Sequence, residues 1–184
     1  MQPELSILDW IQANLQCGFL DHAMPIITLY AEGGILLIGI GIVLLLLRSK
    51  RICGAALLSG LGGGFLIGNL LLKNLIARQR PCWIYSDFSM LIAVPTDYSF
   101  PSGHTMHSFI AATVLMHYDR RLGIPALVMA VLVGFSRLYL YVHYPTDVLA
   151  GAVLGVALGM LTTAIVDKLH ISHIISTMKK SLNP

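Results

Sequence analysis

Long apolar runs separated by short polar or charged segments dominate the pattern of this sequence. Several runs reach about twenty residues, which is the length that an α-helix needs to cross a hydrocarbon core about 30 Å thick. The pattern predicts five spans, at residues 26–47, 52–72, 103–118, 122–141 and 146–166. We therefore expect an all-α fold, an integral membrane bundle of about five to six helices.

The composition supports the same interpretation. Of the 184 residues, 56% are hydrophobic and only 11% are charged, against a charged share of about a quarter in soluble domains. This length suits one helical bundle and leaves no room for a second soluble domain. We predict a single membrane-embedded domain over residues 1–184, with no nucleic-acid partner.

The amino-terminal segment, residues 1–22, shows helical spacing of its apolar residues, among them Leu5, Leu8 and Ile11. Because Trp10 lies among them, an amphipathic helix in the membrane interface is one interpretation. A helix packed against the bundle is equally compatible with this pattern. The segment lacks the early basic residues and the cleavage site of a secretory signal, so we expect it to be retained.

The basic residues divide into two groups along the predicted spans. Eight of the twelve fall on one side, namely Arg48, Lys50, Arg51, Arg120, Arg121, Lys168, Lys179 and Lys180. The other four are Lys73, Arg78, Arg80 and Arg137. Since Lys and Arg accumulate in cytoplasmic loops, the second group, and any site that it forms, is expected at the outer face of the membrane.

Glycines recur every four residues in two spans, at positions 60, 64 and 68 and at positions 151, 155 and 159. This spacing lets helix backbones approach closely. A homodimer is one possible use of these rows, and packing within the bundle is the preferred one.

Lys73 and Arg80 are separated by seven residues, or two helical turns, which predicts that they share a helix face ahead of Pro81. Two such cations bind lipid head groups nonspecifically or clamp a single phosphate. Arg78 is turned about 140° from Lys73 on the same helix, which predicts a solvated or head-group contact.

The segment PSGH, residues 101–104, is typical of a helix start. Ser102 is a favourable N-cap, and the N–H groups of Gly103 and His104 are placed to hold an anion. His104 would then donate a proton to a leaving oxygen. A simple cap next to an interfacial histidine is an equal alternative, and His107 is interpreted as structural.

The segment SRLYLYVHYPTD, residues 136–147, places ionisable groups at the border of an apolar span, where they usually mark function. Asp147 follows His143 by four residues, close enough to accept the ring N–H and make the other nitrogen a better nucleophile. A structural hydrogen bond or half of a metal site are the alternatives. Against a metal, the outward loops add only Asp87 and Asp97, without a recognised spacing.

Together the three segments contain Kx6RP, PSGH and SRx5Hx3D within residues 73–147. This set resembles the three motifs of the type-2 phosphatidic acid phosphatase superfamily, with no departure at the defining positions. The resemblance implies that phosphate is bound by Lys73, Arg80 and Arg137, with assistance from Ser102 and the Gly103 N–H.

The resemblance also implies the chemical roles. His143, oriented by Asp147, would attack phosphorus to give a phosphohistidine, while His104 would protonate the leaving lipid oxygen and later activate water. No metal and no cofactor are expected, because the three cations neutralise the charge that develops on the phosphoryl group.

The expected function is therefore that of a lipid phosphate phosphatase in a bacterial cytoplasmic membrane, with undecaprenyl diphosphate as the preferred substrate. Phosphatidylglycerophosphate, phosphatidic acid and lipid A phosphate are the nearest alternatives, and the loop at residues 82–100 is where selectivity is expected. A non-catalytic phospholipid-binding protein would need neither His104 nor His143. Vanadate-dependent peroxidases resemble the family in their anion site, but they are mostly large and soluble.

Overall fold

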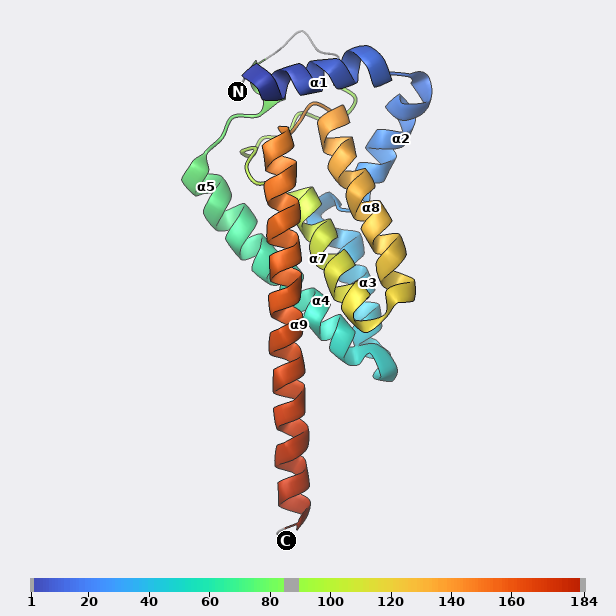
Figure 1. Ribbon diagram of the computed structural model, residues 1–184, viewed down its shortest axis with the longest axis vertical. Coiled ribbons are helices and arrows are strands. Elements are labelled where there is room, and N and C mark those ends of the chain that lie inside the picture. Colours follow the sequence, from blue (N-terminus) through green and yellow to red (C-terminus); the bar gives the residue numbers. More distant parts are fainter. Residues whose placement is uncertain (1, 85–89, 183–184) are drawn as a thin grey trace.

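The computed structural model describes residues 2–84 and 90–182, with side chains over residues 3–84 and 90–172. The longer helices are α1 (Gln2–Leu15), α2 (Gly18–Leu29), α3 (Ile35–Leu46), α4 (Arg51–Gly64), α7 (Gly103–Tyr118), α8 (Arg120–Tyr139) and α9 (Pro145–Leu182). Shorter helical segments are η1 (Glu32–Gly34), η2 (Arg48–Lys50), η3 (Phe65–Leu72), α5 (Lys73–Ile76) and α6 (Pro81–Ile84). Figure 1 shows the long helices side by side as a bundle, with α1 lying across one end.

Helix α7 forms the centre of the bundle. It packs against α4, α8 and α9, and Met106, Ile110 and Val114 on it are fully buried. Its 16 residues reach only about 24 Å at 1.5 Å per residue. Four other helical stretches are long and apolar enough to cross a membrane, at Gly18–Leu46, Arg48–Ile84, Arg120–Tyr139 and Pro145–Ser172. These features confirm the all-α membrane bundle.

Both rows of glycines pack against α7. A Cβ atom on Gly155 would lie 2.5 Å from the carbonyl oxygen of Met106, and one on Gly64 would lie 2.6 Å from a methyl group of Ile110. These glycines therefore allow α4 and α9 to approach α7 closely, as packing within the bundle predicts.

The first predicted span, residues 26–47, is not continuous. Helix α2 ends at Leu29 and α3 begins at Ile35, with η1 between them. Gly33 and Gly34 have φ angles of +55° and +70°, a left-handed conformation that favours glycine. The stretch is long and apolar enough to cross a membrane, as predicted, but the apolar run did not reveal the break made by the two adjacent glycines.

Helix α1 is packed against the bundle on one face and exposes Trp10 on the other, so it has features of both predicted arrangements, the interfacial helix and the packed helix. Leu8 is fully buried, and Leu5 and Ile11 are nearly so, whereas Trp10 remains 58% exposed. The buried face packs on α8 and α9, so α1 covers this end of the bundle (Figure 1). The predicted helix over residues 1–22 is in fact two helices, because the chain turns between Leu15 and Gly18.

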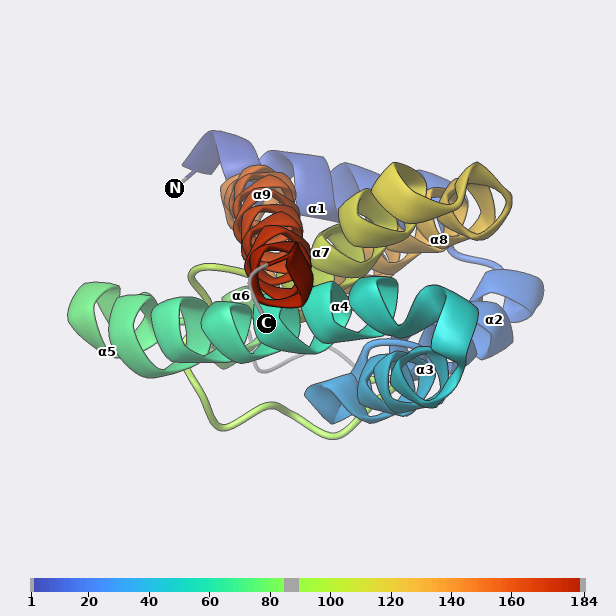
Figure 2. The same cartoon turned by 90° about the horizontal axis from the view of Figure 1, so that it is seen from below.

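The opposite end of the bundle carries the basic turns. Lys50 of η2 forms an ion pair with Asp119, which precedes α8, so the two turns adjoin. At the same level, Tyr118 donates a hydrogen bond to Asp167 of α9. Helix α9 continues past this level to Leu182, about four turns further. Figure 1 shows that it extends well beyond the predicted end at residue 166, and Figure 2 looks along it from its carboxy-terminal end.

Candidate active site

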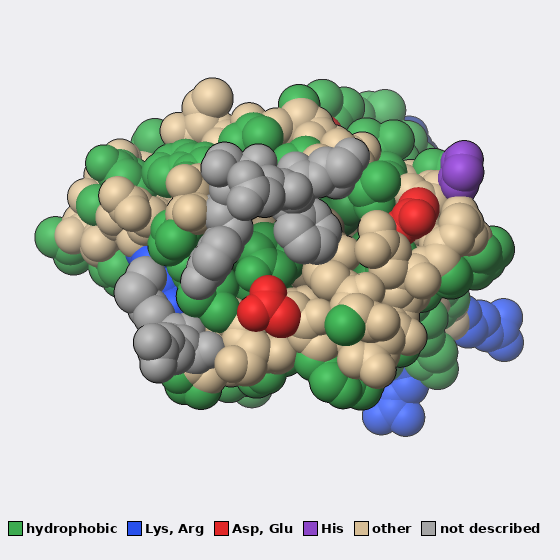
Figure 3. All heavy atoms as spheres, turned by 90° about the horizontal axis from the view of Figure 1, so that it is seen from above, with side chains coloured by type: hydrophobic (Ala, Val, Ile, Leu, Met, Phe, Trp, Pro, Cys, Tyr) green, Lys and Arg blue, Asp and Glu red, His purple; other side chains and the backbone are tan. Residues whose placement is uncertain are grey.

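A cavity of about 680 Å³ lies near the end of the bundle that α1 covers. Five of the residues predicted to form a site line it, namely Lys73, Arg80, Gly103, His104 and Arg137. The side chains of the three cations are nearly fully buried, with exposed fractions of 6%, 2% and 2% in order of sequence. On the face seen in Figure 3, Lys and Arg side chains accordingly occupy only a small part of the surface.

Arg80 connects the first and third motifs. Its Nη1 donates to the carbonyl oxygen of Val142 at 2.8 Å and lies 3.1 Å from Nε2 of His143. A guanidinium is always a donor, so Nε2 of His143 must carry a lone pair rather than a hydrogen. The nitrogen that faces this phosphate-binding candidate is therefore the one that can act as a nucleophile.

Ser99 lies between His143 and Asp147. The Nδ1 atom of His143 is 3.6 Å from Asp147 Oδ2, which is too long for an ordinary hydrogen bond. The Ser99 hydroxyl is 3.3 Å from that Nδ1 and donates to Asp147 at 2.5 Å. The expected direct contact is thus replaced by a serine relay. The position of Ser99, in a loop without periodicity, gave no signal in the sequence.

The surroundings of His143 keep its ring neutral. It is 1% exposed, and burial, followed by the charges of Arg80, Arg137 and Lys73, lowers its pKa well below the ordinary value. A neutral imidazole retains the lone pair that nucleophilic attack requires.

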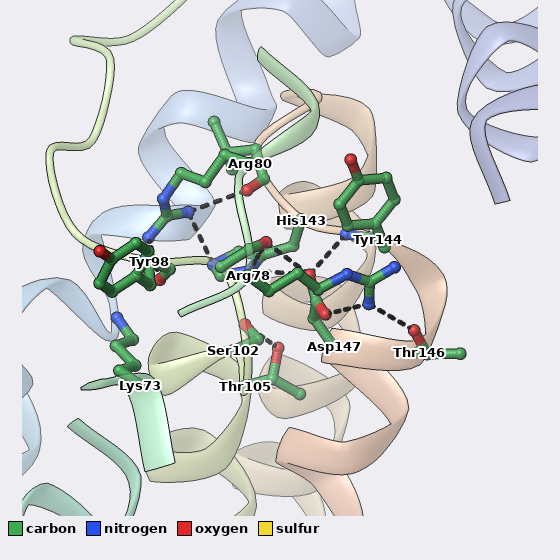
Figure 4. A network of polar contacts seen from close by, with 12 residues as sticks. Lys73, Arg78, Arg80, Tyr98, Ser102, Thr105, His143, Tyr144, Thr146 and Asp147 are labelled. Atoms are coloured by element: carbon green, nitrogen blue, oxygen red, sulfur yellow. Dashed lines mark hydrogen bonds and ion pairs between the residues drawn. The ribbon is translucent and has the colours of Figure 1, made fainter. Parts of the chain in front are cut away.

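Arg78 does not make the solvated or head-group contact that the sequence predicts. Figure 4 shows it against the third motif, where it donates to Asp147 at 2.5 Å and to Glu4 of α1 at 2.6 Å. Its guanidinium also lies 3.9 Å from the centre of the Tyr144 ring. Asp147 is consequently held by Arg78, by Ser99 and by the backbone N–H of Tyr144.

The position of Arg78 has a local cause in the backbone. Helix α5 ends at Ile76, and Ala77 adopts a left-handed conformation with φ of +49°. The helical geometry that predicted a shared face for Lys73 and Arg80 therefore stops between them. The two side chains meet instead through Asp97, whose carboxylate pairs with both.

Asp97 is the counter-ion of the two cations. Its Oδ1 accepts a hydrogen bond from Arg80 at 2.7 Å, and its Oδ2 pairs with Lys73. Burial alone would raise its pKa, but the hydrogen bond and charge of Lys73, and then Arg80, lower the pKa to about 2. The carboxylate is therefore ionised throughout the neutral range and loses its charge only as the pH falls through about 2.

Replacing Asp97 by asparagine is expected to lower the melting temperature by about 2–4 °C in phosphate-free buffer, since two buried cations lose their counter-ion. Added inorganic phosphate should raise the melting temperature more in Asp97→Asn than in the unaltered protein, because the anion takes the place of the missing charge. Thermal unfolding followed by intrinsic fluorescence measures both effects. Asp21→Asn, which removes a carboxylate bonded to Tyr139, is the control. Equal phosphate shifts in all three proteins would contradict the counter-ion role.

Helix α2 and η1 supply two partners that the motifs did not indicate. Thr28 accepts a hydrogen bond from Arg137 Nη1 at 2.5 Å, and Glu32 Oε2 lies 3.0 Å from His104 Nε2. Both residues line the cavity. Both lie within an apolar run of the sequence, whose pattern predicts an ordinary span and gives no sign of these contacts.

Ser102 stands at the N-cap position of α7, but its side chain does not cap the helix. Its hydroxyl is 2.9 Å from that of Thr105, and it is fully buried. The cap prediction is therefore wrong in this detail. Neither Ser102 nor His143 nor Asp147 lines the cavity among the described residues, whereas Gly103 does.

The chain belongs to the PAP2 superfamily, whose family model matches residues 50–171. Undecaprenyl-diphosphatase BcrC of Bacillus subtilis is 32% identical over 143 residues, covering 77% of this chain and 72% of that protein. An undecaprenyl-diphosphatase of Sulfolobus acidocaldarius is 35% identical over 123 residues, covering 66% and 59%. The chain thus spans a little under two thirds of the length of the latter relative.

Solved structures have the same architecture. A transmembrane PAP2-type phosphatidylglycerolphosphate phosphatase from Bacillus subtilis superposes with a TM-score of 0.75 at 32% identity, covering 91% of this chain and 86% of that one. LpxE of Aquifex aeolicus gives a TM-score of 0.75 at 26% identity, covering 86% and 93%. The likeness therefore extends over nearly the whole bundle and is not confined to the motifs.

Proposed function

We propose that this protein is a lipid phosphate phosphatase that hydrolyses undecaprenyl diphosphate through a phosphohistidine intermediate. One observation carries the proposal. Three buried cations and His104 line a single cavity, and Arg80 at its wall lies against the Nε2 lone pair of His143. Cations fixed in this way stabilise the charge on a transferring phosphoryl group.

The reaction would proceed in two displacements. Nε2 of His143 attacks phosphorus, the bond from phosphorus to the leaving oxygen breaks, and His104 gives that oxygen a proton. In the second step His104 takes a proton from water, the resulting oxygen nucleophile attacks phosphorus, and the bond from nitrogen to phosphorus breaks. Inorganic phosphate and the original His143 are regenerated. Lys73, Arg80 and Arg137 would hold the phosphoryl oxygens throughout, with the N–H of Gly103 at the start of α7.

The lining of the cavity supports a hydrocarbon-linked substrate. Besides the charged groups, the cavity is lined by apolar side chains of α2 and of the loop before Asp97, among them Pro25, Ile26, Leu29, Ile92, Val94 and Pro95. A diphosphate joined directly to a prenyl chain has no head-group hydroxyls to satisfy there, unlike the phosphoglycerol head group of phosphatidylglycerophosphate or the sugars of lipid A. The likeness to two undecaprenyl-diphosphatases supports the same choice.

The distribution of charge supports an outward-facing site. The basic turns around Lys50 and Asp119 adjoin at the end of the bundle opposite the cavity. Because cytoplasmic loops are enriched in Lys and Arg, this end would lie inside and the cavity outside a bacterial cytoplasmic membrane.

Phosphate release by purified protein in detergent tests the proposal. Undecaprenyl diphosphate, phosphatidylglycerophosphate and phosphatidic acid are offered separately with a chelator present. We expect phosphate to be released without added metal. The kcat/KM for undecaprenyl diphosphate should be at least about 10-fold above that for the other two lipids, which corresponds to about 1.4 kcal/mol.

A different ranking would reassign the substrate within the same chemistry. Binding of all three lipids without release would instead favour a non-catalytic lipid-binding protein. Dependence on a divalent cation would overturn the view that the protein's own cations neutralise the phosphoryl charge.

A further inference from the structure

Glu32 owes its place at the cavity to the break between α2 and α3. The two left-handed glycines that follow it, Gly33 and Gly34, end the helical path of α2. The Glu32 carboxylate consequently lines the cavity, with Oε2 3.0 Å from Nε2 of His104. A continuous apolar helix, which the sequence pattern predicts here, can cross a membrane without a pair of glycines and without a carboxylate.

The groups that surround His104 are otherwise unfavourable to a protonated ring. Burial of the ring disfavours its charged form most, Arg137 of α8 and Lys73 of α5 add positive charges beside it, and His107 lies one turn further along α7. His143, between α8 and α9, also interacts with it. Glu32 is the carboxylate that contacts it directly among the described residues. His104 must give up a proton in the first step of the proposed reaction. It would therefore depend on Glu32 to hold that proton before the reaction begins.

The contact also distinguishes the two ring nitrogens. Glu32 accepts the hydrogen on Nε2, whereas Nδ1 of His104 makes no hydrogen bond within residues 3–84 and 90–172. A carboxylate that fixes one nitrogen of an imidazole leaves the other to exchange protons with substrate, and it stabilises the imidazolium form.

We propose that Glu32 is a positioning residue for His104: it stabilises the imidazolium before reaction and directs Nδ1 as the proton donor to the leaving oxygen. The proposal rests on the acid role of His104 in the proposed function. After the first step His104 is the neutral tautomer with hydrogen on Nε2, still bonded to Glu32. Nδ1 then accepts the proton of the attacking water, which restores the imidazolium.

The test compares the pH–rate profiles of the unaltered protein and of Glu32→Gln. Glutamine keeps the size and a hydrogen-bonding oxygen but removes the charge. We expect the basic limb of the profile to move about one unit to lower pH, so that kcat falls about 10-fold above the limb and little below it, with KM nearly unchanged. Glu32→Asp should recover part of the shift. Asp21→Asn, in the preceding helix α2, should retain the unaltered profile.

A loss of kcat that is equal at every pH would show a merely structural contact and overturn the proposal, as would an unchanged profile. A second measurement does not depend on turnover. In protein labelled with ¹⁵N-histidine, the His104 signals, assigned by their absence in His104→Gln, should titrate at lower pH in Glu32→Gln than in the unaltered protein. If no lipid is hydrolysed but this shift is found, the proposed function fails while the pairing stands. An unchanged titration overturns the pairing itself.

Discussion

Replacing His143 by glutamine is expected to lower phosphate release by at least about 10³-fold, because an amide supplies no nucleophile to form the covalent intermediate. Glutamine is preferred to alanine because His143 is 1% exposed, and alanine would leave a cavity in the wall of the site. Turnover of undecaprenyl diphosphate, followed by phosphate release, gives the comparison.

The contacts of the His143 imidazole explain why its replacement is expected to lower phosphate release so strongly. Its Nε2 lone pair faces Arg80 at 3.1 Å, and its Nδ1 is placed by the Ser99 hydroxyl at 3.3 Å. The neutral state that its lowered pKa favours keeps the Nε2 lone pair available for attack. No other histidine among the described residues contacts Arg80, so a substitute nucleophile is lacking.

The control is the binding of inorganic phosphate. His143→Gln should retain the phosphate-dependent rise in melting temperature, since Lys73, Arg80 and Arg137 remain. Labelling from a ³²P-lipid should be found in the unaltered protein after acid-free quenching and be absent from the variant. Turnover above about a tenth of the original rate in a well-folded variant would rule out His143 as the nucleophile.

The sequence was sufficient to predict that three motifs meet. The three motifs lie at the end of the second predicted span, at the start of the third, and between the fourth and the fifth. In an up-and-down bundle these positions are all at the same end, so the motifs lie near one another. Lys73, Arg80, Arg137 and His104 accordingly line one cavity. Charge counting likewise separated this end from the basic turns, which the Lys50–Asp119 pair brings together.

The contacts within the site were less predictable, because they depend on irregular backbone. The left-handed Ala77 turns Arg78 onto Asp147, where an ideal helix would point it elsewhere. Ser99 and Asp97 come from a loop without periodicity, and Glu32 comes from a helix break inside an apolar run. Each of these residues is a partner of a motif residue, so the sequence predicted the motif residues that come together and missed those that hold them.

Arg137→Lys is expected to lower kcat/KM by about 100-fold, although the charge is kept. Arg137 is 2% exposed and uses Nη1 to donate to Thr28, while its Nε has no partner among the described residues and its guanidinium lines the cavity. A planar guanidinium can be anchored at one nitrogen and still present two parallel donors to phosphate. An ammonium on a flexible stem has one nitrogen and must leave either Thr28 or the phosphate. Loss of one charge-assisted bond, at about 1.5–3 kcal/mol, accounts for a factor of about 10 to 150.

The loss should appear mainly in kcat, because the fork matches the oxygens best as charge develops on them. Thr28→Val separates anchoring from charge: it leaves the guanidinium intact, and we expect a loss of only about 10-fold or less. Arg121→Lys, at the other end of the bundle, is the matched control and should not change activity. If Arg137→Lys retained full activity while Thr28→Val lost it, the planar fork would be irrelevant and Thr28 itself would be the group that serves the reaction. The anchored geometry predicts the reverse order, because only the arginine substitution removes a donor from the phosphate.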